Sequence, residues 1–216
     1  MEFKIEKTEV YGLNKSIIAS GNAMRTEMDD NTEDFKERDF SRAVKLGTTK
    51  SGEAHDNFLN GIIVQFDLYA PLYMWKQLQR YHFLDFISSQ STMHRLTKFN
   101  VKEQCVSDVD EVILERYQEL LDKYNNFGAY VFSSEMNDDE KQEKNQLWRT
   151  LVASLPCGFV LGATMTTNYR QLKTQFLQRN NHRLKEWRQY CKWILSLPYF
   201  KELCLGNIDK EVELDD

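Results

Sequence analysis

An alternating run in the middle of the chain restricts the fold more than any other feature. In the range 62–69 every second residue is large and apolar (Ile62, Val64, Phe66 and Leu68), and the positions between them are mixed. Successive side chains of a strand point to opposite faces, so a period of two predicts a β-strand. Pro71 ends the run, and a proline suits the first turn of a helix. We therefore predict a strand that leads directly into a helix.

Composition favours long helices around such strands. The 216 residues include only three prolines and nine glycines, which argues against many short strands and tight turns. Further strands are predicted for 3–10 and for 159–165, where the sequence reads FVLGATM. Apolar residues recur at helical spacing in the ranges 107–124, 137–155, 168–178 and 182–197. The chain is long enough for one substantial core, so we expect a single α/β domain covering residues 1–216.

Charge and cysteine usage exclude several classes of partner. The net charge of −5 lacks the basic footprint of a nucleic-acid-binding protein, although a small anion remains compatible with it. No apolar run reaches the roughly 18 residues of a membrane span, and the first ten residues lack the core of a signal peptide. The four cysteines form no C-x-x-C pair, and the four histidines lack zinc-ligand spacing. We expect a cytoplasmic protein with reduced thiols, no metal and no membrane contact.

Two polar clusters are candidates for a binding site. The range 76–95 contains two arginines, a lysine, two histidines, three glutamines and several hydroxyl groups. The planar donor fork of arginine matches phosphate, so the first cluster suits an anionic heterocycle. In the second cluster Arg170 and Thr174 stand four residues apart on one helical face, between Asn168 and Arg179. Each cluster alone is more typical of a solvated surface than of a binding site, and that alternative stays open here.

The joint order of these segments is similar to a known family. The stretch GEAHDNFLNGIIVQFDLYAPLYMWKQLQRYHFLDFISSQSTMHR resembles the central signature of the flavin-dependent thymidylate synthases. In that family a histidine loop, a strand, a proline, a glutamine, an Arg-His-Arg triplet, and a serine followed by an arginine come in this order. The later stretch LPCGFVLGATMTTNYRQLKTQFLQR resembles the family's Leu-Pro, strand and Asn-x-Arg helix ending in arginine. The resemblance covers roughly residues 45–190.

The resemblance implies a fold and a reaction. The fold would be of the α+β kind, with a mixed, largely antiparallel sheet and long helices, assembled as a homotetramer. The reaction would be the reductive methylation of dUMP, or a related pyrimidine nucleotide, with FAD as cofactor and with NADPH and methylene-tetrahydrofolate as co-substrates. No cysteine nucleophile is needed, because the reduced flavin supplies the hydride and relays the one-carbon unit.

Carried over position by position, the resemblance assigns roles to individual residues. Arg179 and Ser91 would take part in catalysis, Arg179 by stabilising negative charge on a pyrimidine carbonyl. The residues expected to bind the cofactor are His55, Asn60, Arg80, His82, Asn168, Arg170 and Thr174. Those expected to bind the nucleotide are Gln77, Arg80, Ser91, Arg95, Arg149 and Arg179. The expectation common to all is that the Arg80 and Arg179 segments converge on one cavity.

Several positions depart from the family pattern. The triplet reads Arg80-Tyr81-His82, and Asn60 stands where the family has a carboxylate. No acidic residue occurs in 87–91, and Val152 replaces an expected arginine for which Arg149 is the substitute. Three interpretations follow: an active flavoenzyme, a non-catalytic nucleotide- or flavin-binding scaffold of the same fold, or an unrelated α/β domain.

Overall fold

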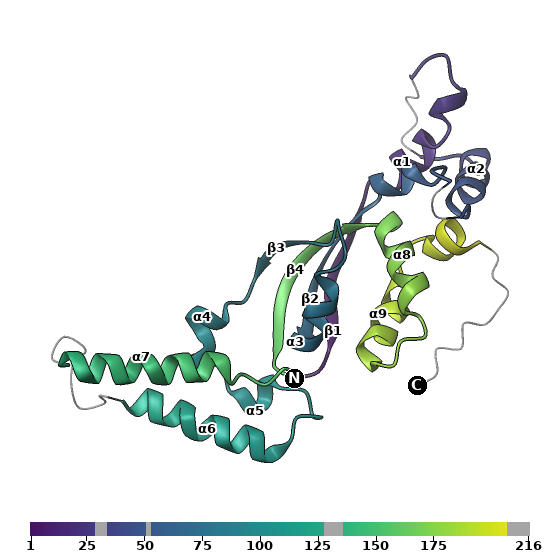
Figure 1. Ribbon diagram of the computed structural model, residues 1–216. Coiled ribbons are helices and arrows are strands. Elements are labelled where there is room, and N and C mark those ends of the chain that lie inside the picture. The colour runs from purple at the N-terminus through teal and green to yellow at the C-terminus, as the bar shows by residue number, and fades with distance from the viewer. Residues whose placement is uncertain (29–33, 51–52, 128–135, 207–216) are drawn as a thin grey trace. The chain divides into compact units, whose positions relative to one another are not determined.

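The computed structural model describes residues 1–28, 34–50, 53–127 and 136–206 (Figure 1). Within these ranges four strands form one antiparallel sheet with the order β1-β2-β4-β3. The strands are β1 (Lys4–Tyr11), β2 (Ile63–Pro71), β3 (Asp85–Ser89) and β4 (Val160–Asn168). The predicted α+β class with an antiparallel sheet is confirmed.

Helices make up much of the remaining described chain. They are α1 (Leu13–Ala19), α2 (Glu37–Gly47), α3 (Leu72–Leu78), α4 (Thr92–Arg95), α5 (Val101–Gln104), α6 (Glu111–Asn126), α7 (Asp138–Ala153), α8 (Tyr169–Arg179) and α9 (Lys185–Leu195). Short helical turns occupy Asn22–Met24, Asn57–Gly61, Leu96–Lys98 and Lys201–Leu205. No helix in the described ranges is both long enough and apolar enough to cross a bilayer.

The chain divides into two compact units built from interleaved segments. The first unit consists of Met1–Lys4, Tyr69–Gln77 and Ser89–Ala163. The second consists of Ile5–Leu68, Leu78–Ser88 and Thr164–Asp216. Neither unit is a continuous stretch of sequence, because the chain passes between them at five points. That residues 1–216 act as one domain stays a prediction.

Strand β2 carries the core of the second unit. Val64, Phe66 and Leu68 are at most 1% exposed, so the predicted alternation corresponds to one fully buried face. The Phe66 ring lies 4.5 Å from that of Trp193 on α9, measured between ring centroids. Burying such side chains contributes roughly 1.5–3 kcal/mol each. The hydrophobic effect therefore holds α9 against this strand.

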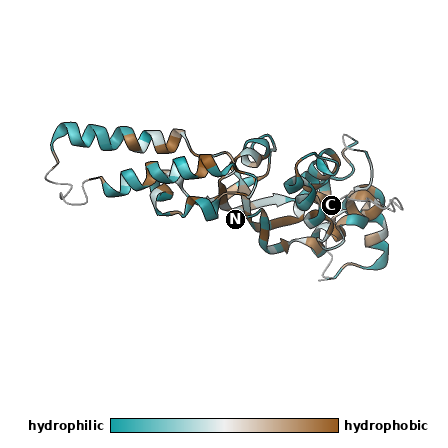
Figure 2. Cartoon of the chain, turned by 90° about the horizontal axis from the view of Figure 1, so that it is seen from below, coloured by the Kyte–Doolittle hydropathy of each residue, from teal (hydrophilic) through white to brown (hydrophobic). Residues whose placement is uncertain are grey.

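A hairpin of α6 and α7 dominates the first unit (Figure 1). Helix α7 begins as predicted, because Asn137 and Glu140 form a reciprocal capping box with two hydrogen bonds of 2.9 Å. The Tyr117 hydroxyl on α6 donates to the Leu151 carbonyl on α7 at 2.9 Å. Hydrophilic residues make up much of both helices of this hairpin (Figure 2).

Two predictions about local structure need correction. Helical spacing predicts that the first helix of the hairpin begins at Ser107 and turns Ile113 inward, because Ile113 is in the apolar stripe Val109, Ile113, Tyr117, Leu120 and Tyr124. It begins instead after Asp110, whose side chain caps Val112, and Ile113 is 52% exposed beside the buried Leu114. Strand β3 was not predicted at all. Its five residues are all exposed at the sheet edge, so they lack the alternation by which a strand is identified.

Candidate functional site

A pocket of about 530 Å³ opens in the second unit. Two stretches line it, the segment 80–83 that follows α3 and the outer face of α8. The lining residues are Arg80, Tyr81, His82, Phe83, Gln171, Thr174, Gln178 and Arg179. The Arg80 and Arg179 segments therefore converge on one cavity, as the sequence predicts. No carboxylate is among these lining residues, whereas two of them are arginines.

Helix α8 turns a polar face to this pocket because its other face is buried. Tyr169, Leu172 and Phe176 are at most 1% exposed, which confirms the predicted apolar side of the helix. The helix starts at Asn168, whose side chain accepts a hydrogen bond of 3.0 Å from the Gln171 amide. Spacing of three and four residues places Gln171, Thr174 and Gln178 on the opposite side.

Arg179 is held by neutral groups. Its Nε donates a hydrogen bond of 2.7 Å to the Tyr81 hydroxyl, which in turn donates to Gln178 Oε1 at 3.1 Å. The guanidinium carbon lies 4.6 Å from the centroid of the buried Trp187 ring and 5.6 Å from that of Tyr81. Cation–π contacts of this kind stabilise a guanidinium without cancelling its charge. In the part of the chain that the structure describes, no carboxylate pairs with Arg179.

Two further cationic or ionisable side chains of the pocket are exposed. Arg80 and His82 lie on the segment after α3 and make no hydrogen bond or ion pair with any residue that the structure describes. Both are therefore available to an anionic ligand. Phe83 beside them is 63% exposed and presents a flat apolar ring.

His182 lies next to Arg179 and stays uncharged near neutral pH. Burial lowers the pKa of its imidazole, and the positive charge of Arg179 lowers that pKa further. Its Nδ1 accepts a hydrogen bond of 3.1 Å from the Leu184 amide, just before α9. A neutral imidazole here adds no second charge beside the guanidinium of Arg179.

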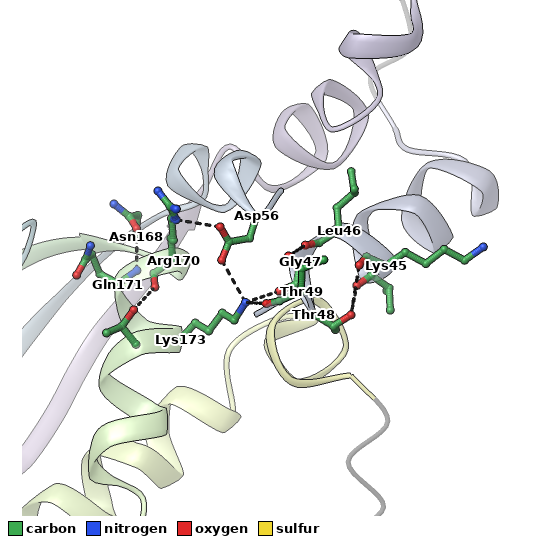
Figure 3. A network of polar contacts seen from close by, with 12 residues as sticks. Lys45, Leu46, Gly47, Thr48, Thr49, Asp56, Asn168, Arg170, Gln171 and Lys173 are labelled. Atoms are coloured by element: carbon green, nitrogen blue, oxygen red, sulfur yellow. Dashed lines mark hydrogen bonds and ion pairs between the residues drawn. The ribbon is translucent and has the colours of Figure 1, made fainter. Parts of the chain in front are cut away.

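A second cluster surrounds a buried carboxylate (Figure 3). Asp56, which is 2% exposed, accepts hydrogen bonds from Arg170 Nε at 3.0 Å and from Lys173 Nζ at 3.1 Å. Lys173 is 3% exposed, and its ammonium also donates to the carbonyls of Gly47 and Thr49 at 2.7 and 2.8 Å. A buried ammonium is tolerated only when its charge is paired and its donors are satisfied. The cluster thus ties α8 to the segment that follows α2.

Sequence reasoning missed Asp56 and Lys173. Asp56 is adjacent to the predicted His55, and Lys173 stands one turn after the predicted Arg170. A lone lysine next to an apolar position normally points to solvent, so nothing in the spacing indicated its burial.

The predicted cofactor residues do not all lie at one site, and their roles stay predictions. Arg80, His82 and Thr174 line the pocket. Arg170 is in the Asp56 cluster, and its side chain remains 32% exposed. Asn168 caps α8 and is 7% exposed, whereas His55 and Asn60 are exposed near the turn Asn57–Gly61 and do not line the pocket.

The remaining predicted nucleotide residues belong to the first unit. Ser91 caps α4 by accepting from the His94 amide at 3.3 Å, and its Oγ lies 2.9 Å from His94 Nδ1. Arg95 ends the same short helix and is exposed, and Arg149 is exposed on α7. Gln77 is half-buried near the end of α3. The roles assigned to these four residues stay predictions.

Comparison with solved structures identifies the fold of this chain, whereas comparison of sequences finds no relative. No protein-family model matches the chain, and no curated protein matches it either. One solved structure of the flavin-dependent thymidylate synthase ThyX from Helicobacter pylori, complexed with FAD and dUMP, matches with a TM-score of 0.61 at 17% identity. Another structure of that enzyme with FAD and dUMP gives 0.63 at 15% identity. Each match covers 94% of this chain and 96% of the other. The interpretation as an unrelated fold is thereby excluded: this chain has the fold of the flavin-dependent thymidylate synthases.

Proposed function

We propose that this protein binds FAD and a pyrimidine nucleotide such as dUMP and methylates the pyrimidine reductively. The proposal includes NADPH and methylene-tetrahydrofolate as co-substrates and a cytoplasmic homotetramer as the working form. The two Helicobacter pylori structures support it, because they share this fold and hold FAD and dUMP.

The pocket with two arginines and no carboxylate is the observation that carries the proposal. A hydrogen bond to a charged group contributes roughly 1.5–3 kcal/mol, about twice a neutral one. An arginine without an acidic partner near a cavity therefore favours an anionic ligand over an empty pocket. Arg80 and Arg179 have no acidic partner among the residues that the structure describes, and the pocket volume is within the roughly 300–1,000 Å³ of ligand sites.

The side chains of the pocket fit a flat, anionic, heterocyclic group. The exposed Phe83 ring offers a stacking surface, and Gln171, Thr174 and Gln178 offer neutral polar contacts. When bound, FAD supplies the redox chemistry and carries the one-carbon unit. In the proposed roles Arg179 donates to a pyrimidine carbonyl and stabilises negative charge on it, and Arg80 faces a phosphate.

Flavin reduction by NADPH, measured with and without dUMP, tests the proposal. Wild-type protein should reduce FAD faster when dUMP is present, and Arg179→Ala should abolish that dependence. Arg116→Ala serves as the control, because Arg116 is exposed on α6 and forms an ion pair with Glu119, and neither residue lines the pocket. Absence of reduction in every condition would refute the proposed activity.

The second candidate function is a non-catalytic scaffold that binds flavin or nucleotide. The altered triplet favours it, since Tyr81 replaces the family's histidine and its hydroxyl is engaged by Arg179. Purified protein that is yellow and reduces its flavin supports the enzyme. Protein that binds FAD or dUMP but never transfers a hydride supports the scaffold.

A further inference from the structure

The two arginines of α8 are both anchored through Nε, but by chemically different partners. Arg170 Nε donates to the carboxylate of Asp56, and Arg179 Nε donates to the phenol of Tyr81. An Nε anchor leaves the terminal amino groups of a guanidinium available, since arginine has five N–H donors in a rigid fork. A carboxylate bound to Nε neutralises the guanidinium, whereas a neutral phenol leaves its positive charge available to a ligand.

We propose that Tyr81 is a positioning residue that orients Arg179 without neutralising it, so that its terminal amino groups form a two-pronged donor for the nucleotide. This inference rests on the proposed function and deepens it. The ligand group it takes is an acceptor oxygen with negative or developing negative charge, such as a pyrimidine carbonyl whose two lone pairs accept from both amino groups.

Three contacts restrict the guanidinium. The hydrogen bond of 2.7 Å from Nε to the Tyr81 hydroxyl fixes one corner, and the Trp187 ring at 4.6 Å supports its face. The bond from Tyr81 to Gln178 Oε1 orients the phenol, because a hydroxyl that donates to the amide has its lone pairs left for Arg179. Tyr81 also packs edge-on against Trp187 with ring centroids 6.0 Å apart. Within the described ranges, the terminal nitrogens of Arg179 bond to no other residue.

The position of Tyr81 in the sequence gives this contact its significance. It is the middle residue of Arg80-Tyr81-His82, where the resembled family has histidine. An imidazole is shorter than a phenol, so a histidine here could not reach Arg179 in the same way. In this chain the substitution therefore adds a contact to the very arginine on which the proposed chemistry depends.

Hydrogen exchange of the Arg179 side chain tests the anchor without any nucleotide. The Nε–H signal in nitrogen-15 NMR spectra of the full-length protein is assigned by its disappearance in Arg179→Lys. In Tyr81→Phe we expect this proton to exchange at least tenfold faster, since it loses its acceptor. Tyr199→Phe is the matched control, because Tyr199 is also in the second unit and its hydroxyl bonds to no described residue. Unchanged exchange in Tyr81→Phe would overturn the inference.

Titration with dUMP tests the consequence for the ligand. Tyr81→Phe should weaken dUMP binding roughly tenfold. Its thermal unfolding midpoint should equal that of the control variant Tyr199→Phe. Equal affinity in both variants overturns the positioning role, even if the wild type is an active enzyme. Protein that binds dUMP with this difference but never reduces flavin supports the inference and refutes the proposed catalysis. A wild type that does not bind dUMP refutes both.

Discussion

The two ends of α8 hold an arginine each and use it in opposite ways. At the start of the helix Arg170 shares the buried carboxylate of Asp56 with Lys173. At its end Arg179 contacts neutral partners among the described residues, the Tyr81 phenol and the Trp187 ring. The first arrangement joins distant segments of the fold, whereas the second leaves a positive charge facing a pocket.

The difference teaches what separates a cation that is neutralised within the fold from one that is available to a ligand. A buried charge needs a counter-charge, because the cost of taking an ion out of water is several kcal/mol even after relaxation. Lys173 meets that need within the protein. Arg179 is only partly buried and lacks a carboxylate among the described residues, so an external anion can supply it.

Removing the carboxylate of the structural cluster should have the largest effect. Asp56→Ala leaves the buried Lys173 without its counter-charge, and we expect a loss of about 3–5 kcal/mol in the free energy of unfolding. Urea denaturation measures it. Glu119→Ala, which breaks an exposed ion pair with Arg116, should change stability by less than about 1 kcal/mol. Equal effects in the two variants would contradict a structural role for Asp56.

Removing Arg179, the cation of the pocket, should affect ligand binding more than stability. Arg179→Ala should weaken dUMP binding roughly 10- to 100-fold, because it removes charge-assisted hydrogen bonds. Its free energy of unfolding should fall by only about 1 kcal/mol, from the lost bond to Tyr81 and the lost ring contact. Calorimetric titration and urea denaturation of the same preparation check both. If the variant lost as much stability as Asp56→Ala and bound dUMP normally, the comparison would be wrong.

Adding a carboxylate to the pocket should give Arg179 an acidic partner, as Arg170 has at the other end of α8. Gln178→Glu places a negative charge beside the Tyr81 hydroxyl and Arg179, so the arginine gains an internal partner. We expect dUMP affinity to fall about tenfold and the unfolding free energy to stay nearly constant. Gln142→Glu, on the exposed surface of α7, adds the same charge away from the pocket. Its affinity should equal that of the wild type.

The smallest effect concerns pH. Burial and Arg179 lower the pKa of His182, so the folded state binds fewer protons than the unfolded chain near and below the ordinary histidine pKa of about 6.5. Stability should therefore decrease as the pH falls from 7.5 to 5.5. His182→Asn keeps an acceptor for the Leu184 amide but cannot be protonated, and its stability should fall less. Urea midpoints of the wild type and of His182→Asn at pH 7.5 and pH 5.5 measure this difference. If the midpoint fell equally in both proteins, the lowered pKa of His182 would not explain the pH dependence.

Local periodicity correctly predicted the buried faces of several elements. It failed where two adjacent apolar residues could each be buried and tertiary packing determines which one is. The alternation at Val64, Phe66 and Leu68 and the helical stripe of Tyr169, Leu172 and Phe176 correspond to buried faces. In α6, by contrast, Ile113 and Leu114 are adjacent and equally apolar, and only contact with α7 and its neighbours selects Leu114. Strand β3 pairs with β4 through backbone hydrogen bonds, and its five side chains are all exposed. Its sequence therefore has no alternation of apolar and polar residues that would predict a strand.

The sequence by itself determined the main strands and helices, because these follow from periodicity. Its resemblance to the flavin-dependent thymidylate synthases implied the antiparallel α+β fold and the meeting of the Arg80 and Arg179 segments. The tertiary structure alone decided which cations are neutralised. Asp56 and Lys173 are 117 residues apart, and Tyr81 and Arg179 are 98 apart, so no local pattern connects them. Whether a charge is structural or available to a ligand depends on what faces it in space, and only the folded chain specifies that.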